Sequence, residues 1–140
     1  GPNLNLLGQR EQSQYGSKNY KYLIEICNKR AKELNLNLDI KQSNVEGEIV
    51  NLIQESVSVY DGIIINAAAY SHTSVAIRDA LDVFKKPKIE VHISNIYKRE
   101  EFRHKSMISG VVNGIICGLG INGYILAINS MHELLENENK

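Results

Sequence analysis

Apolar residues change their spacing several times along the chain, and each change predicts a new element of secondary structure. They recur at helical spacing over residues 17–34, and again after Glu46. Between these two helices, residues 36–40 alternate apolar and polar side chains, which is typical of a strand. Ser43 and Glu46 have the spacing of a capping box, so we expect the second helix to begin there.

The rest of the chain continues the alternation of strands and helices. A short, continuous apolar run at residues 62–66 is typical of a strand buried on both faces of a parallel sheet. We expect a helix over residues 73–84, strands over 88–94 and 111–117, and a last helix over 121–135. This order of elements predicts an α/β fold, a doubly wound and mostly parallel sheet with helices on both faces.

The beginning of the chain is unusual for such a fold. The length of 140 residues fits one domain, so we expect residues 1–140 to form a single domain. An α/β domain normally opens with a strand, whereas Gly1-Pro2-Asn3 indicates a turn that leads into a helix. We therefore expect the first strand of the sheet to lie upstream of Gly1.

Composition and charge narrow the possible partners. Hydrophobic residues make up 43% of the chain, which is enough for a packed core. The 16 Lys and Arg residues balance the 16 Asp and Glu residues, so the chain lacks the positive charge of a general nucleic-acid binder. No apolar run reaches the ~18 residues of a membrane span, and no secretory signal opens the chain. We expect no nucleic acid or membrane partner, and a cytoplasmic protein in which Cys27 and Cys117 are buried, reduced thiols.

Candidate chemistry gathers where the strands of the predicted sheet end, which is where doubly wound folds bind ligands. Glu90, His92 and Ser94 share one face of a strand. An acid two residues from a histidine can accept a hydrogen bond from its ring, as in a general acid or base. Asn66 ends the preceding strand, and His72 follows in the next loop.

Two polar segments each allow two interpretations. Residues 8–16 form a glycine-bounded loop that carries Arg10 and Tyr15, and this loop is either a solvated connection or a mobile lid over a ligand. Residues 97–105 concentrate basic side chains, among them Arg99 and Arg103. They form either a solvated face or a site for a small carboxylate or phosphate.

One glycine motif does not fit the function that its pattern suggests. Residues 118–123 spell G-x-G-x-x-G between a strand and a helix, as in dinucleotide sites. The chain ends before the second strand and acidic residue that such a site requires, so we interpret the glycines as turn and packing residues. The four histidines lack metal-ligand spacing, and we expect no metal.

Nearly the whole chain resembles the type II 3-dehydroquinate dehydratases, in order and without large insertions. The most specific match is Ile89-Glu90-Val91-His92-Ile93-Ser94-Asn95. The other matching stretches are residues 1–8, 10–11, 15–16, 42–44, 46–48, 65–66, 69–76, 78–80, 99–100, 102–103 and 118–124.

The resemblance implies a flavodoxin-like fold, a short strand before Gly1 and a dodecamer built from four trimers. It implies a lyase of the shikimate pathway that converts 3-dehydroquinate to 3-dehydroshikimate without a cofactor, by anti elimination of water through an enolate. The same resemblance makes Tyr15 the base, with Arg10 and Arg99 stabilising its phenolate. His92, oriented by Glu90, would then protonate the departing hydroxyl.

The resemblance also implies how the substrate is held. Asn3 would lie near a water that stabilises the enolate oxygen. The implied substrate-binding residues are Asn66 with the backbone of Ile93 and Ser94 for the carboxylate, His72 and Arg103 for ring hydroxyls, and Asp79, which reaches across a subunit boundary.

The sequence departs from the family pattern at four positions, none of which is a catalytic group. Gln12 and Gln14 stand in the loop where a proline and an acid are common, Ala67 replaces a proline, and Met107 replaces a tyrosine. The alternative function is a flavodoxin-like module that binds a phosphate or flavin without catalysis. Such a module has no use for the Arg10 and Tyr15 loop.

Overall fold

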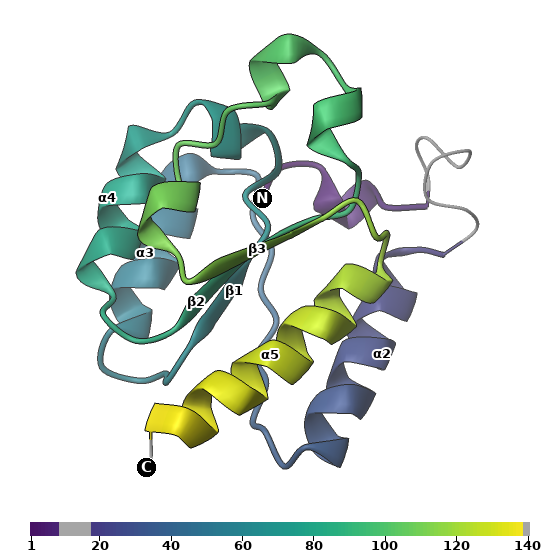
Figure 1. Ribbon diagram of the computed structural model, residues 1–140, viewed down its shortest axis with the longest axis vertical. Coiled ribbons are helices and arrows are strands. Elements are labelled where there is room, and N and C mark those ends of the chain that lie inside the picture. Colours follow the sequence, from purple (N-terminus) through teal and green to yellow (C-terminus); the bar gives the residue numbers. More distant parts are fainter. Residues whose placement is uncertain (9–17, 139–140) are drawn as a thin grey trace.

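The computed structural model describes residues 1–8 and 18–138 of the chain (Figure 1). Three strands, β1 (Ile63–Ile65), β2 (Lys88–His92) and β3 (Gly114–Cys117), form a parallel sheet in the order β1-β2-β3. The parallel α/β arrangement that the sequence predicts is therefore confirmed.

Helices cover the sheet on both sides. Helices α3 (Glu46–Ser56) and α4 (Val75–Val83) pack together on one face. Helices α2 (Tyr20–Glu33) and α5 (Asn122–Glu138) pack together on the other (Figure 1). Helix α2 begins after Asn19, whose side chain accepts a hydrogen bond from a backbone N–H of the first turn. The expected start of this helix at residue 17 lies outside the described residues.

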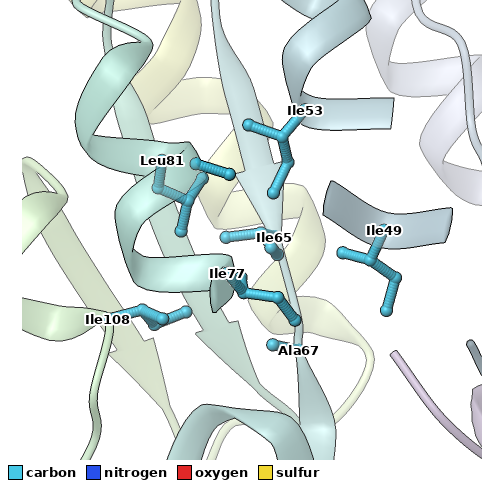
Figure 2. Close-up of a cluster of buried hydrophobic side chains, with 8 residues drawn as sticks. Ile49, Ile53, Ile65, Ala67, Ile77, Leu81 and Ile108 are labelled. Atoms are coloured by element: carbon cyan, nitrogen blue, oxygen red, sulfur yellow. The ribbon is translucent and has the colours of Figure 1, made fainter. Parts of the chain in front are cut away.

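Each face of the sheet has its own hydrophobic core. Figure 2 shows the core beneath α3 and α4, which consists of Ile49, Ile53, Ile65, Ala67, Ile77, Ala80, Leu81 and Ile108. The core beneath α2 and α5 includes Cys27, a free thiol whose pKa burial raises to about 11. Cys117 is also a free thiol, but it is only half-buried, so the expectation that both cysteines are buried is wrong for this one. It lies on β3, an edge strand of the sheet that the described residues form, where β2 is its one neighbouring strand.

The predicted strand at residues 36–40 is not a strand in the structure. These residues belong to none of the strands of the described chain, and Leu36, Leu38 and Ile40 instead pack against the core beneath α2 and α5. Alternation of apolar and polar residues indicates that one side of an extended segment is buried. It does not indicate whether a neighbouring strand is present to form the backbone hydrogen bonds that a strand needs.

The predicted capping box is also wrong. Helix α3 has Val45 as its N-cap residue, without a side-chain cap. The Ser43 hydroxyl instead accepts the Val45 N–H at 3.0 Å and donates to the Glu48 carboxylate at 3.1 Å. Ser43 therefore closes a turn just before the helix, which begins at the expected residue.

Strand β2 is held tightly at its beginning. The Lys88 ammonium is buried and donates to the carbonyl oxygens of Leu81 at 2.7 Å and Phe84 at 2.6 Å, at the end of α4. The Lys88 backbone N–H donates to the Asn113 side chain at 2.8 Å. Strand β3 is shorter than predicted because residues Ser109–Val111 form a 3-10 turn, η5. Within the described residues, no helix has the length and apolar character needed to cross a bilayer.

Candidate active site

A cleft of about 180 Å³ opens at the carboxyl ends of β1 and β2, where the sequence predicts ligand binding. Its walls come from the N-terminal segment, the turn after β1, the end of β2 and residues 97–105, which we call the basic segment. Eight of the predicted site residues line it: Asn3, Asn66, His72, His92, Ile93, Ser94, Arg99 and Arg103.

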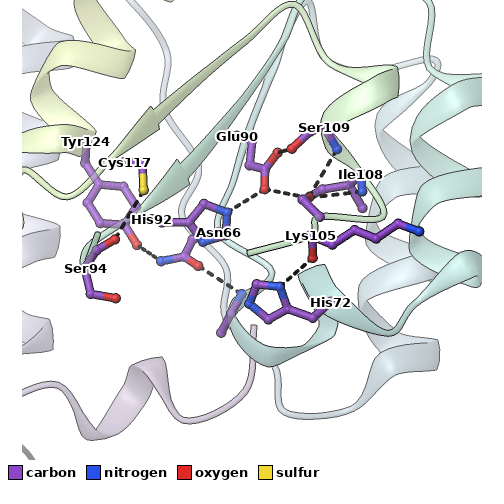
Figure 3. A network of polar contacts seen from close by, with 12 residues as sticks. Asn66, His72, Glu90, His92, Ser94, Lys105, Ile108, Ser109, Cys117 and Tyr124 are labelled. Carbon is purple, nitrogen blue, oxygen red and sulfur yellow. Dashed lines mark hydrogen bonds and ion pairs between the residues drawn. The ribbon is translucent and has the colours of Figure 1, made fainter. Parts of the chain in front are cut away.

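A buried histidine that lines this cleft, His92, lies against a buried glutamate, Glu90, which does not line it. Because successive residues of a strand face opposite ways, β2 places both side chains on one face. Glu90 is 0% exposed and His92 is 4% exposed. The Nε2 atom of His92 lies 2.5 Å from a Glu90 carboxylate oxygen (Figure 3). The hydrogen bond that the sequence spacing predicts is present.

Two serines that the sequence analysis did not single out complete the surroundings of Glu90. The hydroxyls of Ser106 and Ser109 donate to the Glu90 carboxylate at 2.9 and 2.5 Å. Burial raises the pKa of Glu90, but the hydrogen bonds from His92, Ser109 and Ser106, together with the positive charge on His92, outweigh it. The net pKa of Glu90 lies below its ordinary value. Glu90 is therefore a carboxylate at neutral pH.

The partners of the two site histidines fix which ring nitrogens carry protons. His92 directs Nε2 at the Glu90 carboxylate, so Nε2 is protonated. His72 directs Nδ1 at the Lys105 carbonyl oxygen, 2.8 Å away, so Nδ1 is protonated and Nε2 is left for a ligand. The two rings stack with their centroids 6.3 Å apart (Figure 3). Together they present two imidazoles on one side of the cleft.

The amide of Asn66 is held in one orientation. Its oxygen accepts the Ala68 N–H at 2.9 Å, and its nitrogen donates to the Tyr124 hydroxyl at 2.7 Å. Tyr124 comes from the first turn of α5 and is a positioning residue that the sequence analysis did not identify. The signal that could have found it is an aromatic residue directly after the glycine motif, at the edge of the sheet where the strands end.

The basic segment divides into side chains that reach the cleft and side chains that do not. Arg99 and Arg103 line the cleft, whereas Lys98 and Lys105 are exposed and do not. These four side chains lie in or next to two 3-10 turns, η3 (Ile96–Lys98) and η4 (Glu101–Arg103), which direct them differently. Arg103 also forms an ion pair with the exposed Glu100 and holds the pKa of that carboxyl below its ordinary value.

The N-terminal segment is tied to the loop before α3. Asn3 has a left-handed backbone, with φ at 68°, and its N–H donates to the Asn44 side chain at 2.9 Å. Gln42 donates to the same Asn44 oxygen at 3.0 Å and to the Gly1 carbonyl at 3.0 Å. These contacts place Asn3 in the wall of the cleft.

The glycine motif supports the end of β2. The N–H of Gly118 donates to the His92 carbonyl at 3.2 Å, and that of Gly120 donates to the Ile93 carbonyl at 3.0 Å. Both glycines have positive φ, and a Cβ on Gly118 would lie 3.0 Å from the Asn95 side chain. This agrees with the interpretation of these glycines as turn residues.

The other four predicted site residues are not among the residues that line the cleft: Glu90 lies buried behind His92, and the remaining three are Asp79, Arg10 and Tyr15. Asp79 is exposed on α4 and does not line the cleft. Arg10 and Tyr15 lie outside the described residues. Within residues 1–8 and 18–138, no three His, Cys, Asp or Glu side chains are grouped so as to hold a metal ion.

A parallel sheet with helices on both faces and a carboxylate-bound histidine at the strand ends defines an α/β protein with a candidate acid–base site. The family model for class II dehydroquinases matches residues 1–132. The chain belongs to this family.

Individual relatives are similar in sequence to this chain over nearly their full length. The chain is 52% identical to a 3-dehydroquinate dehydratase of Prochlorococcus marinus, over 97% of this chain and 94% of that protein. It is 54% identical to a 3-dehydroquinate dehydratase of Caldicellulosiruptor saccharolyticus, over 96% of this chain and 94% of that protein. The crystal structure of a type II dehydroquinase from Butyrivibrio crossotus superposes with a TM-score of 0.91 at 52% identity, covering 94% of this chain and 92% of the other.

Proposed function

We propose that this protein is a hydro-lyase that dehydrates 3-dehydroquinate to 3-dehydroshikimate in the shikimate pathway, which leads to chorismate and the aromatic amino acids. The observation that carries the proposal is the buried hydrogen bond between Glu90 and His92, because His92 lines a cleft together with two arginines. Family membership and the names of the full-length relatives support it.

The substrate is a ring β-hydroxy ketone with a carboxylate, and loss of water requires a base, a site for the enolate and an acid. Tyr15 is the base in this proposal. A free tyrosine, with a pKa of about 10, is mostly protonated at neutral pH. Positive charge from Arg10 and Arg99 favours its phenolate. The half-buried position of Arg99 in the wall of the cleft supports this role.

His92 is the acid that protonates the departing hydroxyl. The Glu90 carboxylate beside Nε2 stabilises the protonated ring, which leaves Nδ1 as the nitrogen that gives its proton to the substrate. Since the ring is buried and hydrogen-bonded, it does not need to reorient during the reaction.

The remaining residues of the cleft hold the substrate. Asn66 and the backbone N–H groups of Ile93 and Ser94 bind its carboxylate, and His72 and Arg103 bind ring hydroxyls. The free Nε2 of His72 and the fixed amide of Asn66 support these roles. Asn3 holds a water against the enolate oxygen.

The assembly in this proposal is a cytoplasmic dodecamer of four trimers in which residues 1–140 form one domain. Val75, Asp79 and Val83 follow one another at four-residue spacing on the outer face of α4, and the two valines are 51% and 62% exposed. A solvent-facing apolar stripe around a carboxylate supports a subunit contact at this helix. Light scattering tests it, and a monomeric mass at micromolar concentration would exclude the dodecamer.

The direct test of the activity is to mix the purified protein with 3-dehydroquinate and follow the ultraviolet absorbance of the conjugated product. We expect turnover without added metal or cofactor. The competing function, a flavin- or phosphate-binding module, predicts no absorbance change, and a flavin form of it predicts a yellow protein. The Glu90 and His92 pair favours the lyase, because a binding module needs no acid.

A further inference from the structure

Two serine hydroxyls contact the buried carboxylate of Glu90. Ser106 Oγ lies 2.9 Å from the carboxylate oxygen that also contacts His92, and Ser109 Oγ lies 2.5 Å from the other oxygen. Neither serine lines the cleft. Both follow Arg103 in the chain, so only folding brings them next to β2, and Figure 3 shows Ser109 beside Glu90.

The direction of both hydrogen bonds is determined. Ser106 Oγ accepts the backbone N–H groups of Ile108 and Ser109, each at 3.2 Å. Its own hydrogen is therefore directed at Glu90, which lies 2.9 Å away. Ser109 faces an ionised carboxylate, which only accepts, so Ser109 also donates. Glu90 thus receives three donors in a place where water does not reach it.

We propose that Ser106 and Ser109 are positioning residues that keep Glu90 ionised, so that the proton shared by the pair resides on His92 and not on Glu90. The role of this proton in catalysis rests on the proposed function. Its location is a property of the free protein and is measurable without a substrate.

The surroundings of the pair make these donors necessary. His72 stacks on His92, and Arg99 and Arg103 line the same cleft, so among the described residues the other titratable side chains that line it are basic. Positive neighbours disfavour an imidazolium, and burial disfavours a bare carboxylate. Without the hydroxyls, the pair lowers its free energy by moving the proton from His92 Nε2 to Glu90. The ring then becomes neutral, and a neutral imidazole is a weaker acid than an imidazolium.

The test is to remove the Ser109 hydroxyl and to follow the ring nitrogens of His92 by ¹⁵N nuclear magnetic resonance. A His92→Gln variant assigns the signals. In the wild-type protein we expect a protonated Nε2. In Ser109→Ala we expect a smaller imidazolium fraction at every pH, and a neutral form protonated at Nδ1, because a protonated Glu90 then donates to Nε2. Ser109→Thr retains the hydroxyl and should restore the wild-type spectrum.

Kinetics provide the second measurement. We expect kcat of Ser109→Ala to fall about tenfold, the effect typical of losing one hydrogen bond to a charged group. KM should change less than about twofold, since the serine does not line the cleft. The matched control is Ser56→Ala, which removes a half-buried hydroxyl bonded at 2.7 Å to the Leu52 carbonyl in α3.

The outcomes separate the two proposals. Unchanged His92 signals in Ser109→Ala, or an equal loss of kcat in Ser56→Ala, would overturn the positioning role. If the wild-type protein does not dehydrate 3-dehydroquinate, the proposed function fails, while the spectra still decide where the proton resides. If Ser109→Ala does not fold, Ser109→Cys fills the same space with a weaker donor, and it should shift the His92 signals in the same direction.

Discussion

The two sides of the cleft are built differently. The side proposed to supply the acid is carried by β2, where Glu90 and His92 are almost completely buried and the Glu90 carboxylate contacts His92, Ser106 and Ser109. The arginine side is carried by short 3-10 turns, where Arg99 and Arg103 are half-buried and Arg103 pairs with an exposed glutamate. An acid needs a controlled protonation state, which requires burial and fixed donors. An arginine is always charged and needs only to be placed.

The largest effect should come from removing the acid itself. In His92→Asn, an amide of similar reach replaces the ring but does not transfer a proton. We expect kcat to fall by at least about 100-fold, within the range typical of a positioned acid, with a much smaller change in KM. The measurement is steady-state dehydration followed by absorbance. A kcat within a few-fold of the wild type would show that another group protonates the departing hydroxyl.

The arginine side of the cleft should respond differently. Arg103→Ala removes a charged hydrogen-bond donor from the cleft, so we expect KM to rise by about tenfold or more, with a smaller change in kcat. Lys98→Ala is the matched control, because Lys98 lies in the same basic segment but is exposed outside the cleft. Equal effects in both variants would mean that only the net charge of the segment matters.

A smaller effect should follow from loosening Asn66. Tyr124→Phe keeps the ring and deletes the hydroxyl that the Asn66 amide contacts at 2.7 Å. We expect KM to rise by a few-fold, since the loss of one neutral hydrogen bond costs about 1 kcal/mol. Tyr97→Phe is the control, because the Tyr97 ring is 64% exposed. Identical kinetics in Tyr124→Phe and the wild type would show that the Asn66 orientation does not depend on Tyr124.

The smallest effect concerns stability and pH. The folded protein lowers the pKa of Glu90 below its unfolded value, so its charged form stabilises the fold above the unfolded pKa of about 4.3. This contribution is lost as the pH falls through the lower, folded pKa. Glu90→Gln does not titrate. We therefore expect the wild type to exceed the variant in unfolding free energy at pH 7, and the difference to shrink towards pH 3. Denaturant titrations at several pH values measure it, and a constant difference would contradict the pKa shift.

The sequence predicts the buried half of this site better than the loops. Glu90 and His92 share a strand, so the two-residue spacing alone predicts that their side chains meet. The cluster of positive charge in the basic segment is visible in the sequence. The sequence does not indicate, however, that Arg99 and Arg103 point towards the cleft while the neighbouring lysines do not. That choice depends on two 3-10 turns, for which periodicity gives no signal.

The serines and the apparent strand at residues 36–40 show the same limit. Ser106 and Ser109 lie 16 and 19 residues from Glu90, in a loop, and serines in loops are common. Their contact with Glu90 exists only after the chain has folded. Residues 36–40 alternate as a strand does, but the pattern contains no information about a hydrogen-bonding neighbour.

The anchoring of β2 at both ends has a dynamic consequence. Lys88 ties its first residue to the end of α4, and the N–H groups of the glycine turn hold the backbone at and just after its last residue. Segments fixed in this way exchange their amide hydrogens only when a large part of the protein opens. The residues proposed to perform the acid step therefore belong to the part of the chain that opens last. On heating, the hydrogen bond between Glu90 and His92 and the global structure should disappear together.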